Sequence, residues 1–205
     1  MRSLFCTALF FVGAARTAHA DRQEWRLSLA GVVTDAMAER SSSAGAGINP
    51  GARARFGYGV RNWLELGGSA GFSWAPGVVF PKAVVDKQPG NLNADVIAVE
   101  MAGSIRLQAD VPFGRAFFAR NRPFVDVRTG LLLEIVRAPK LLDQNGDIVL
   151  ALSETVTPRA FVGAALGLEH RIAGAWLGGI SVDYVYAGSA YQSVGCTLEV
   201  SWMTY

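Results

Sequence analysis

Cysteine is scarce in this chain of 205 residues, which contains only Cys6 and Cys196. Because Cys6 lies in an N-terminal segment with the pattern of a removable signal, Cys196 is expected to remain alone in the mature protein. A single thiol excludes an intramolecular disulfide and a cysteine-rich metal cluster.

Histidine is equally scarce, and His170 is the only one outside that N-terminal segment. An acyl hydrolase would need this histidine beside a serine and a carboxylate. Glu169 adjoins it in the sequence, but consecutive residues of a strand point to opposite faces, and the chain has no Gly-x-Ser-x-Gly motif. We therefore predict no catalytic residue, no cofactor and no metal site, and we interpret His170 as an interfacial side chain.

Long apolar runs are also lacking. After residue 20, no stretch of ~20 consecutive apolar residues is free of charge, so the sequence predicts no transmembrane helix. The mean hydropathy is nevertheless positive, and the chain contains 23 glycines. In an exported chain without a helical span, this combination favours a transmembrane β-barrel.

Residues 1–20 have the parts of a secretory signal. Arg2 supplies a basic start, residues 4–12 form an apolar run, and Ala-His-Ala at 18–20 is a cleavage site. We predict a cleaved signal peptide over 1–20 and a single domain over 21–205. The formal net charge of +2 is carried by the signal's arginines, so the sequence indicates no nucleic-acid partner.

A period of two is the most informative pattern that is present. From Ile97 to Leu107 every second residue is apolar or glycine, while Glu100, Ser104 and Arg106 lie between them. This alternation predicts a strand with one apolar and one polar face. The pattern recurs along the chain and predicts strands at about 24–34, 48–60, 63–74, 97–110, 124–137, 154–170, 175–186 and 193–205.

Such strands form either a soluble sheet structure or a barrel in a membrane. The order of the connections favours the barrel, because long polar connections at 35–45, 75–93 and 138–153 alternate with short turns. The connection 111–123 is long for a periplasmic turn. We predict an all-β, eight-stranded, antiparallel up-and-down transmembrane β-barrel.

The charged residues of the strands share one face, which becomes the interior of a barrel. Arginine predominates over lysine there, which suits enclosed ion pairs. We interpret these residues as a structural network, because an eight-stranded barrel is only wide enough for its own side chains. A selectivity lining or a proton-conducting path is the alternative. The predicted network comprises Glu24, Arg26, Arg53, Arg55, Glu65, Glu100, Arg106, Asp126, Arg128, Glu134, Arg159, Glu169, Asp183 and Glu199.

Aromatic residues gather near the ends of the predicted strands. Amphipathic rings are expected at the level of the lipid headgroups, where they form two girdles around a barrel. The predicted interfacial aromatics are Trp25, Tyr58, Trp63, Trp74, Phe124, Trp176, Tyr184, Tyr186 and Trp202.

The whole mature pattern resembles the small outer-membrane β-barrels of Gram-negative bacteria, the group that includes the transmembrane domain of outer membrane protein A. The resemblance is architectural and identifies no subfamily. It implies an outer-membrane location, contact with outer-membrane lipids, and recognition by the assembly machinery of a C-terminal aromatic residue. Tyr205 is the terminal aromatic residue, but the apolar residues at every second position lead up to Trp202 instead.

The function that this pattern predicts is non-enzymatic. We expect an envelope-structural role, or interaction with an extracellular ligand through the three long connections. One alternative is a narrow channel for small solutes. A lipid-modifying barrel enzyme is another, although no credible constellation of residues supports it. A soluble periplasmic barrel with a ligand pocket is a third.

The segment 143–147, Asp-Gln-Asn-Gly-Asp, loosely matches a calcium-binding loop, with Glu154 at the twelfth position. It lacks flanking helical patterns, and Asn-Gly is typical of a tight turn. We therefore predict a surface turn here, with weak calcium binding as the alternative.

Overall fold

The computed structural model describes residues 24–36, 49–108, 121–143, 145–188 and 191–204. The predicted signal peptide, most of the predicted connections 35–45 and 111–123, and Tyr205 lie outside these residues. Among the described residues, no helix has the length and hydropathy needed to cross a membrane. The strands are β1 Trp25–Ala36, β2 Asn49–Arg61, β3 Leu64–Val85, β4 Gln88–Gln108, β5 Asn121–Leu142, β6 Ile148–Ala151, β7 Thr155–Ala173, β8 Trp176–Tyr186 and β9 Gln192–Met203.

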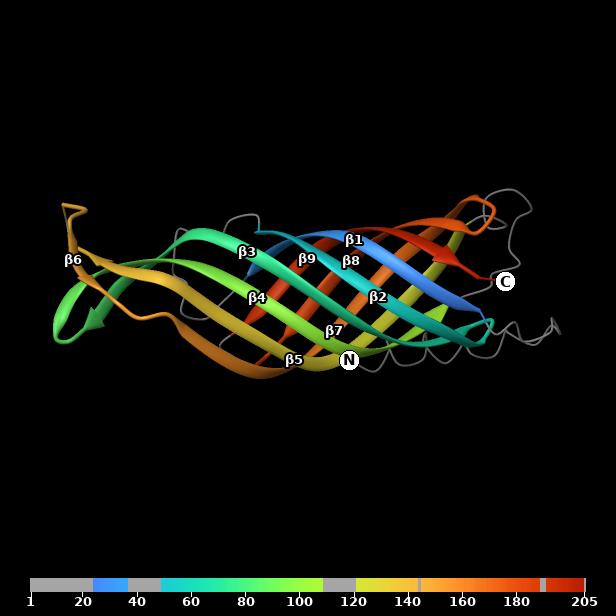
Figure 1. Ribbon diagram of the computed structural model, residues 1–205, viewed down its shortest axis with the longest axis horizontal. Coiled ribbons are helices and arrows are strands. Elements are labelled where there is room, and N and C mark those ends of the chain that lie inside the picture. Colours follow the sequence, from blue (N-terminus) through green and yellow to red (C-terminus); the bar gives the residue numbers. More distant parts are fainter. Residues whose placement is uncertain (1–23, 37–48, 109–120, 144, 189–190, 205) are drawn as a thin grey trace, which may run out of the picture.

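Eight of these strands close into one antiparallel barrel (Figure 1). β1 pairs with β2 on one side and with β9 on the other, so the first and last strands complete the ring. β4 pairs with β5, and β5 pairs with β7. The short β6 pairs with β5 outside the ring. The predicted eight-stranded antiparallel barrel is confirmed, with β6 as an addition.

Consecutive side chains point alternately out of the barrel and into it. On β9, Leu198 and Val200 are 66% and 51% exposed, whereas Thr197 and Ser201 are 3% and 2% exposed. An exterior of exposed aliphatic groups around a polar interior is the inverse of a protein folded in water. Such an exterior is favourable where an apolar medium surrounds it.

The prediction of loops at 75–93 and 138–153 is wrong, because both segments are largely strand. β3 and β4 continue as a hairpin as far as Val85 and Gln88, and β5 continues to Leu142 beside β6. Together they form a twisted sheet that protrudes beyond one end of the barrel, at the left of Figure 1, away from the C-terminus. We call residues 75–95 and 137–151 the β-extension.

The sequence predicts loops instead of these strands because they contain proline and turn-forming residues. The ladder between β3 and β4 shifts register between Ala75 and Val78, and the shift accommodates Pro76. A second shift between residues 80 and 83 accommodates Pro81. Asp86 and Lys87 have φ angles of 50° and 67° and make the hairpin turn. Positive φ at both central residues is typical of the turn that matches the twist of paired strands.

The two prolines lie on an edge of the β-extension. β2 pairs with β3 only as far as Ser73, so the described part of β3 beyond that point has β4 as its one neighbour. Edge strands pair readily with other chains, and a proline without an N–H interrupts such pairing. We expect the variant P76T/P81T to form oligomers in detergent while the natural chain does not. Cross-linking followed by size-exclusion chromatography measures this.

The control is V79T, which adds a threonine hydroxyl to β3 without restoring an N–H group. Equal oligomer content in P76T/P81T and V79T would show that the prolines do not protect this edge.

The connection between β5 and β6 is a turn built on Asp143. Its Oδ1 accepts hydrogen bonds from the backbone N–H groups of Asn145 and Asp147, at 2.8 and 2.9 Å. Gly146 has a φ of 89°, which glycine adopts without strain. The carboxylate of Asp143 thus stabilises the turn itself.

Candidate functional site

The barrel interior is filled by ion pairs, many of them between strands that are not neighbours in the sheet. Glu24 lies just before β1 and forms none of the ion pairs found among the described residues. The other predicted charges lie on strands, and all of them except Glu134 and Arg159 pair in two layers. The lower layer, nearer to residues 24 and 204, comprises Arg26, Arg55, Glu65, Arg106, Asp126, Glu169 and Glu199, and the upper layer comprises Arg53, Glu100, Arg128 and Asp183.

Arg106 is the centre of the lower layer. Its Nε lies 3.2 Å from Asp126 Oδ2 and its Nη2 lies 3.0 Å from Glu199 Oε2, while Nη1 also contacts Glu169. The guanidinium carbon lies 4.1 Å from the ring centroid of Phe124. One side chain from β4 thereby links β5, β7 and β9 across the interior.

Glu65 completes this layer from β3. Its carboxylate lies 3.3 Å from Arg26 Nε and 2.8 Å from Arg55 Nη1. Gly57 on β2, which pairs with Gly67, leaves the space for this carboxylate, because a Cβ atom there would lie 2.0 Å from Glu65 Oε1. Any side chain at position 57 would therefore require the Glu65 carboxylate to shift.

The upper layer joins β2, β4, β5 and β8. Asp183 lies 3.2 Å from Arg53 Nη1 and 2.8 Å from Arg128 Nη2, and it also accepts a hydrogen bond from the hydroxyl of Thr197. Glu100 contacts Arg53, and its Oε1 lies 3.6 Å from Arg128 Nη1. Each carboxylate therefore has two cationic partners, which offsets the cost of burying it.

Apolar side chains close the interior on the side of the upper layer nearer the β-extension. Leu132 and Phe161 are each 2% exposed and pack with Val185 and Tyr191. Burial raises the pKa of the Tyr191 phenol, which lies between β8 and β9. Sequence reasoning did not single out Leu132, Phe161 or Val185, although Leu132 shares the face of Arg128 and Glu134 by simple alternation.

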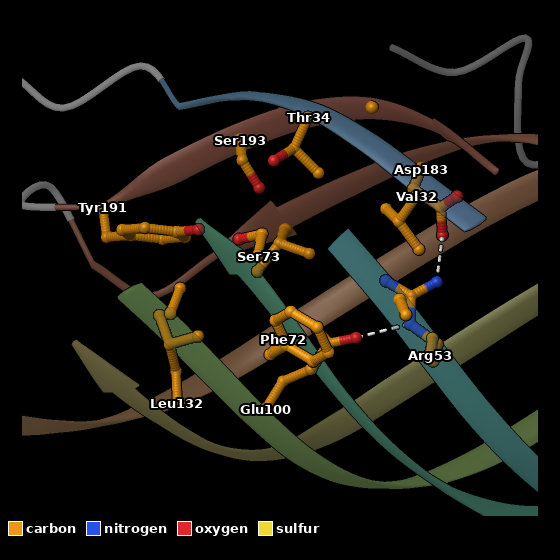
Figure 2. Close-up of a pocket in the computed structure, with 14 residues that line it drawn as sticks. Val32, Thr34, Arg53, Phe72, Ser73, Glu100, Leu132, Asp183, Tyr191 and Ser193 are labelled. Carbon is orange, nitrogen blue, oxygen red and sulfur yellow. Dashed lines mark hydrogen bonds and ion pairs between the residues drawn. The ribbon is translucent and has the colours of Figure 1, made fainter. Parts of the chain in front are cut away.

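Two small cavities inside the barrel are lined by residues that the structure describes. The upper cavity, of about 30 Å³, lies between the upper layer and the apolar side chains (Figure 2). The lower cavity, of about 20 Å³, lies between the two layers. Arg53 and Asp183 line both of them. Since one water molecule needs a cavity of roughly 10–15 Å³, each of the two cavities has room for one or two water molecules.

The last predicted pair of charges lies apart from the layers. Arg159 Nε is 2.9 Å from Glu134 Oε2, and the two side chains are 27% and 19% exposed. This pair is therefore better hydrated than either layer.

The predicted aromatics lie on the outer surface at the strand ends, with one exception. Trp25 stacks on Phe56, with ring centroids 5.0 Å apart, and contacts Tyr58 at 4.5 Å. The exposed members at the end nearer to residues 24 and 204 are Trp25, Trp63, Trp176 and Trp202, and those at the other end are Trp74, Tyr184 and Tyr186.

Phe124 is the exception, and the prediction that it is interfacial is wrong. Its ring is 4% exposed and lies inside the barrel against Arg106. Phe124 lies two residues before Asp126 on the same strand, so both side chains point into the barrel. Gly167, which faces it on β7, leaves the space, because a Cβ atom there would lie 2.4 Å from the ring.

The remaining candidates lie on the outside. His170 is exposed at the end of the barrel, where Nδ1 lies 2.9 Å from Asn121 Oδ1. Cys196 is exposed on the outer face of β9. In the part of the chain that the structure describes, no three His, Cys, Asp or Glu side chains are placed to hold a metal ion.

The barrel fold of this chain is found in known structures. The chain matches neisserial surface protein A, with a TM-score of 0.58 and 12% identity over 88% of this chain and 99% of that one. The fold is that of the small outer-membrane β-barrels. The structure of Ail, the attachment invasion locus protein of Yersinia pestis, matches with a TM-score of 0.54 and 9% identity over 89% and 99% of the two chains.

The outer membrane protein OprG of Pseudomonas aeruginosa has the same fold, with a TM-score of 0.52 and 10% identity over 90% of this chain and 97% of that one. No protein-family model matches the sequence, and no curated protein matches it. At these identities the likeness concerns the fold, so function is argued below from the residues.

Proposed function

We propose that this protein is a non-enzymatic barrel of the Gram-negative outer membrane that presents the β-extension at the cell surface to an extracellular partner. The extension carries the proposal. Ile97 on β4 pairs with Trp74, one of the aromatic residues at the end of the barrel next to the β-extension. From Ile97 back to Pro89, near the start of β4, the strand rises about 3.3 Å per residue, so it extends roughly 25 Å beyond these aromatic residues.

The outer surface supports a membrane location. Leu29, Leu166 and Leu198 are each about two-thirds exposed on different strands, at 66%, 67% and 66%. Aromatic residues flank this aliphatic belt at both ends, as they do where rings meet lipid headgroups. We therefore propose that outer-membrane lipids surround the belt and that the assembly machinery inserts the chain there.

The closed interior supports a role outside the barrel rather than in it. Ion pairs span the interior in two layers, and the two cavities beside them hold only water-sized groups. A surface role has a parallel in Ail, whose structure was determined with a heparin analogue, sucrose octasulfate. We propose that the partner of this chain likewise binds outside the membrane.

Lysine labelling tests the orientation directly. Beyond the predicted signal, the lysines of this chain are Lys82, Lys87 and Lys140, and all belong to the β-extension. We expect a membrane-impermeant amine reagent to label Lys87 and Lys140 on intact cells, because both are exposed. Peptide mass spectrometry identifies the modified residues.

The matched control is the variant K82R/K87R/K140R, which keeps the charges but removes the reactive amines. Labelling that begins only after the outer membrane is permeabilised would contradict the proposal and favour a periplasmic protein or the opposite orientation.

Conductance measurements distinguish this function from the narrow channel. We expect the purified barrel to show no ion currents in planar bilayers, because the Arg53–Asp183 pair separates the two cavities. Discrete openings with the natural chain would contradict a closed interior. D183L, which removes that pair, serves as the comparison, because currents only in the variant would locate the closure at this contact.

A further inference from the structure

The lower cavity lies where the two ionic layers meet. It is lined by charged groups from both layers, which include Arg55, Arg106, Asp126, Arg128, Asp183 and Glu199. The hydroxyl groups of Ser28, Ser181 and Thr197 also line it. A space of about 20 Å³ with walls of this kind is polar enough and large enough for one small hydrogen-bonding molecule.

Several of the lining groups have unused hydrogen-bonding capacity. Asp126 Oδ1, both terminal nitrogens of Arg55, and Nη1 of Arg128 are buried without an aligned hydrogen bond. Arg55 meets Glu65 and Asp126 as ion pairs, at 2.8 and 3.5 Å. The side chains of Arg55, Asp126 and Arg128 are 4%, 4% and 2% exposed, so bulk water does not reach them.

The chemistry of these groups selects a neutral ligand. We propose that the lower cavity binds a single water molecule, which accepts hydrogen bonds from Arg55 and Arg128 and donates one to Asp126. A halide ion would accept from the arginines but would face the Asp126 carboxylate, and a cation would face guanidinium groups. Water alone among these satisfies both kinds of group at once.

This water would connect the layers. Arg55 and Asp126 belong to the lower layer and Arg128 to the upper one, and a bridging water would add a contact between them. The two layers would then form one hydrogen-bonded network rather than two separate ones. This inference concerns the interior and is independent of the proposed surface role.

A cavity-filling substitution gives the first test. Ala165 is 6% exposed and lines the lower cavity. If water occupies the site, A165V displaces it and leaves Asp126 and the arginines unsatisfied, and we expect the unfolded fraction in urea to rise about tenfold. Ala98 lines the upper cavity at 7% exposure and supplies the matched control, A98V.

A165V that is more stable than the natural chain, or no less stable than A98V, would overturn the proposal. The second test does not depend on the variants folding. A high-resolution crystal structure of the natural chain in bromide should show a water-sized density within hydrogen-bond distance of Asp126 Oδ1, without an anomalous signal. A bromide peak or an empty site would overturn it.

Discussion

Replacing Leu198 with arginine is expected to destabilise the barrel in lipid by about 2–4 kcal/mol, which is the cost of placing arginine on the lipid face at mid-membrane. Leu198 is 66% exposed and lies in the middle of β9, in register with Gly31 on β1 and Ile180 on β8. In a barrel surrounded by water, the same exposed substitution would change stability by no more than about 0.5 kcal/mol. The expected effect therefore separates the membrane interpretation from the soluble one.

The measurement is urea unfolding of the barrel reconstituted in lipid vesicles, with the gel mobility of unheated and boiled samples as a second readout. Val84 provides the control, because it is 68% exposed but lies on the β-extension. V84R should unfold at the same urea concentration as the natural chain. Equal effects of the two substitutions would contradict an apolar environment confined to the belt.

The sequence predicted the barrel because alternation along the strands is a local property. Each strand needs only its own residues to define an apolar and a polar face, so the inward position of Arg106 or Asp183 follows from the chain alone. Phe124 was misplaced for an instructive reason. Its aromatic character suggested a position in a girdle, whereas its spacing of two residues from Asp126 indicated an inward side chain. In the structure the Phe124 ring lies inside the barrel.

The β-extension was missed because its strands contain residues that usually end strands. Pro76 and Pro81 lie where the ladder shifts register, and Asp86 and Lys87 form a turn without glycine. The strand conformation of the β-extension depends on the pairing of β3 with β4 and of β4 with β5, which is information from elsewhere in the chain. The contact between Arg106 and Glu169 is likewise beyond local reasoning, because it spans the interior between strands that do not pair.

Replacing Arg106 with methionine is expected to have the largest effect on stability, about 3–5 kcal/mol. Methionine roughly preserves the volume but leaves Asp126, Glu169 and Glu199 without their shared cation. Carboxylates already outnumber guanidinium groups in the lower layer, so the loss leaves buried negative charge with fewer partners. Urea unfolding in vesicles measures the change in stability. We also expect that a large fraction of the R106M chains will fail to refold when the urea is removed.

Arg159 provides the matched control, because it forms one ion pair with Glu134 and is 27% exposed. R159M should cost less than about 1 kcal/mol, as solvent-accessible pairs do. A second comparison tests the cause: E169Q removes one of the carboxylates that Arg106 holds, so R106M/E169Q should be less destabilised than the sum of the single variants. Strict additivity, or equal losses for R106M and R159M, would mean that the interior network contributes little, and that strand pairing and the apolar belt suffice to close the barrel.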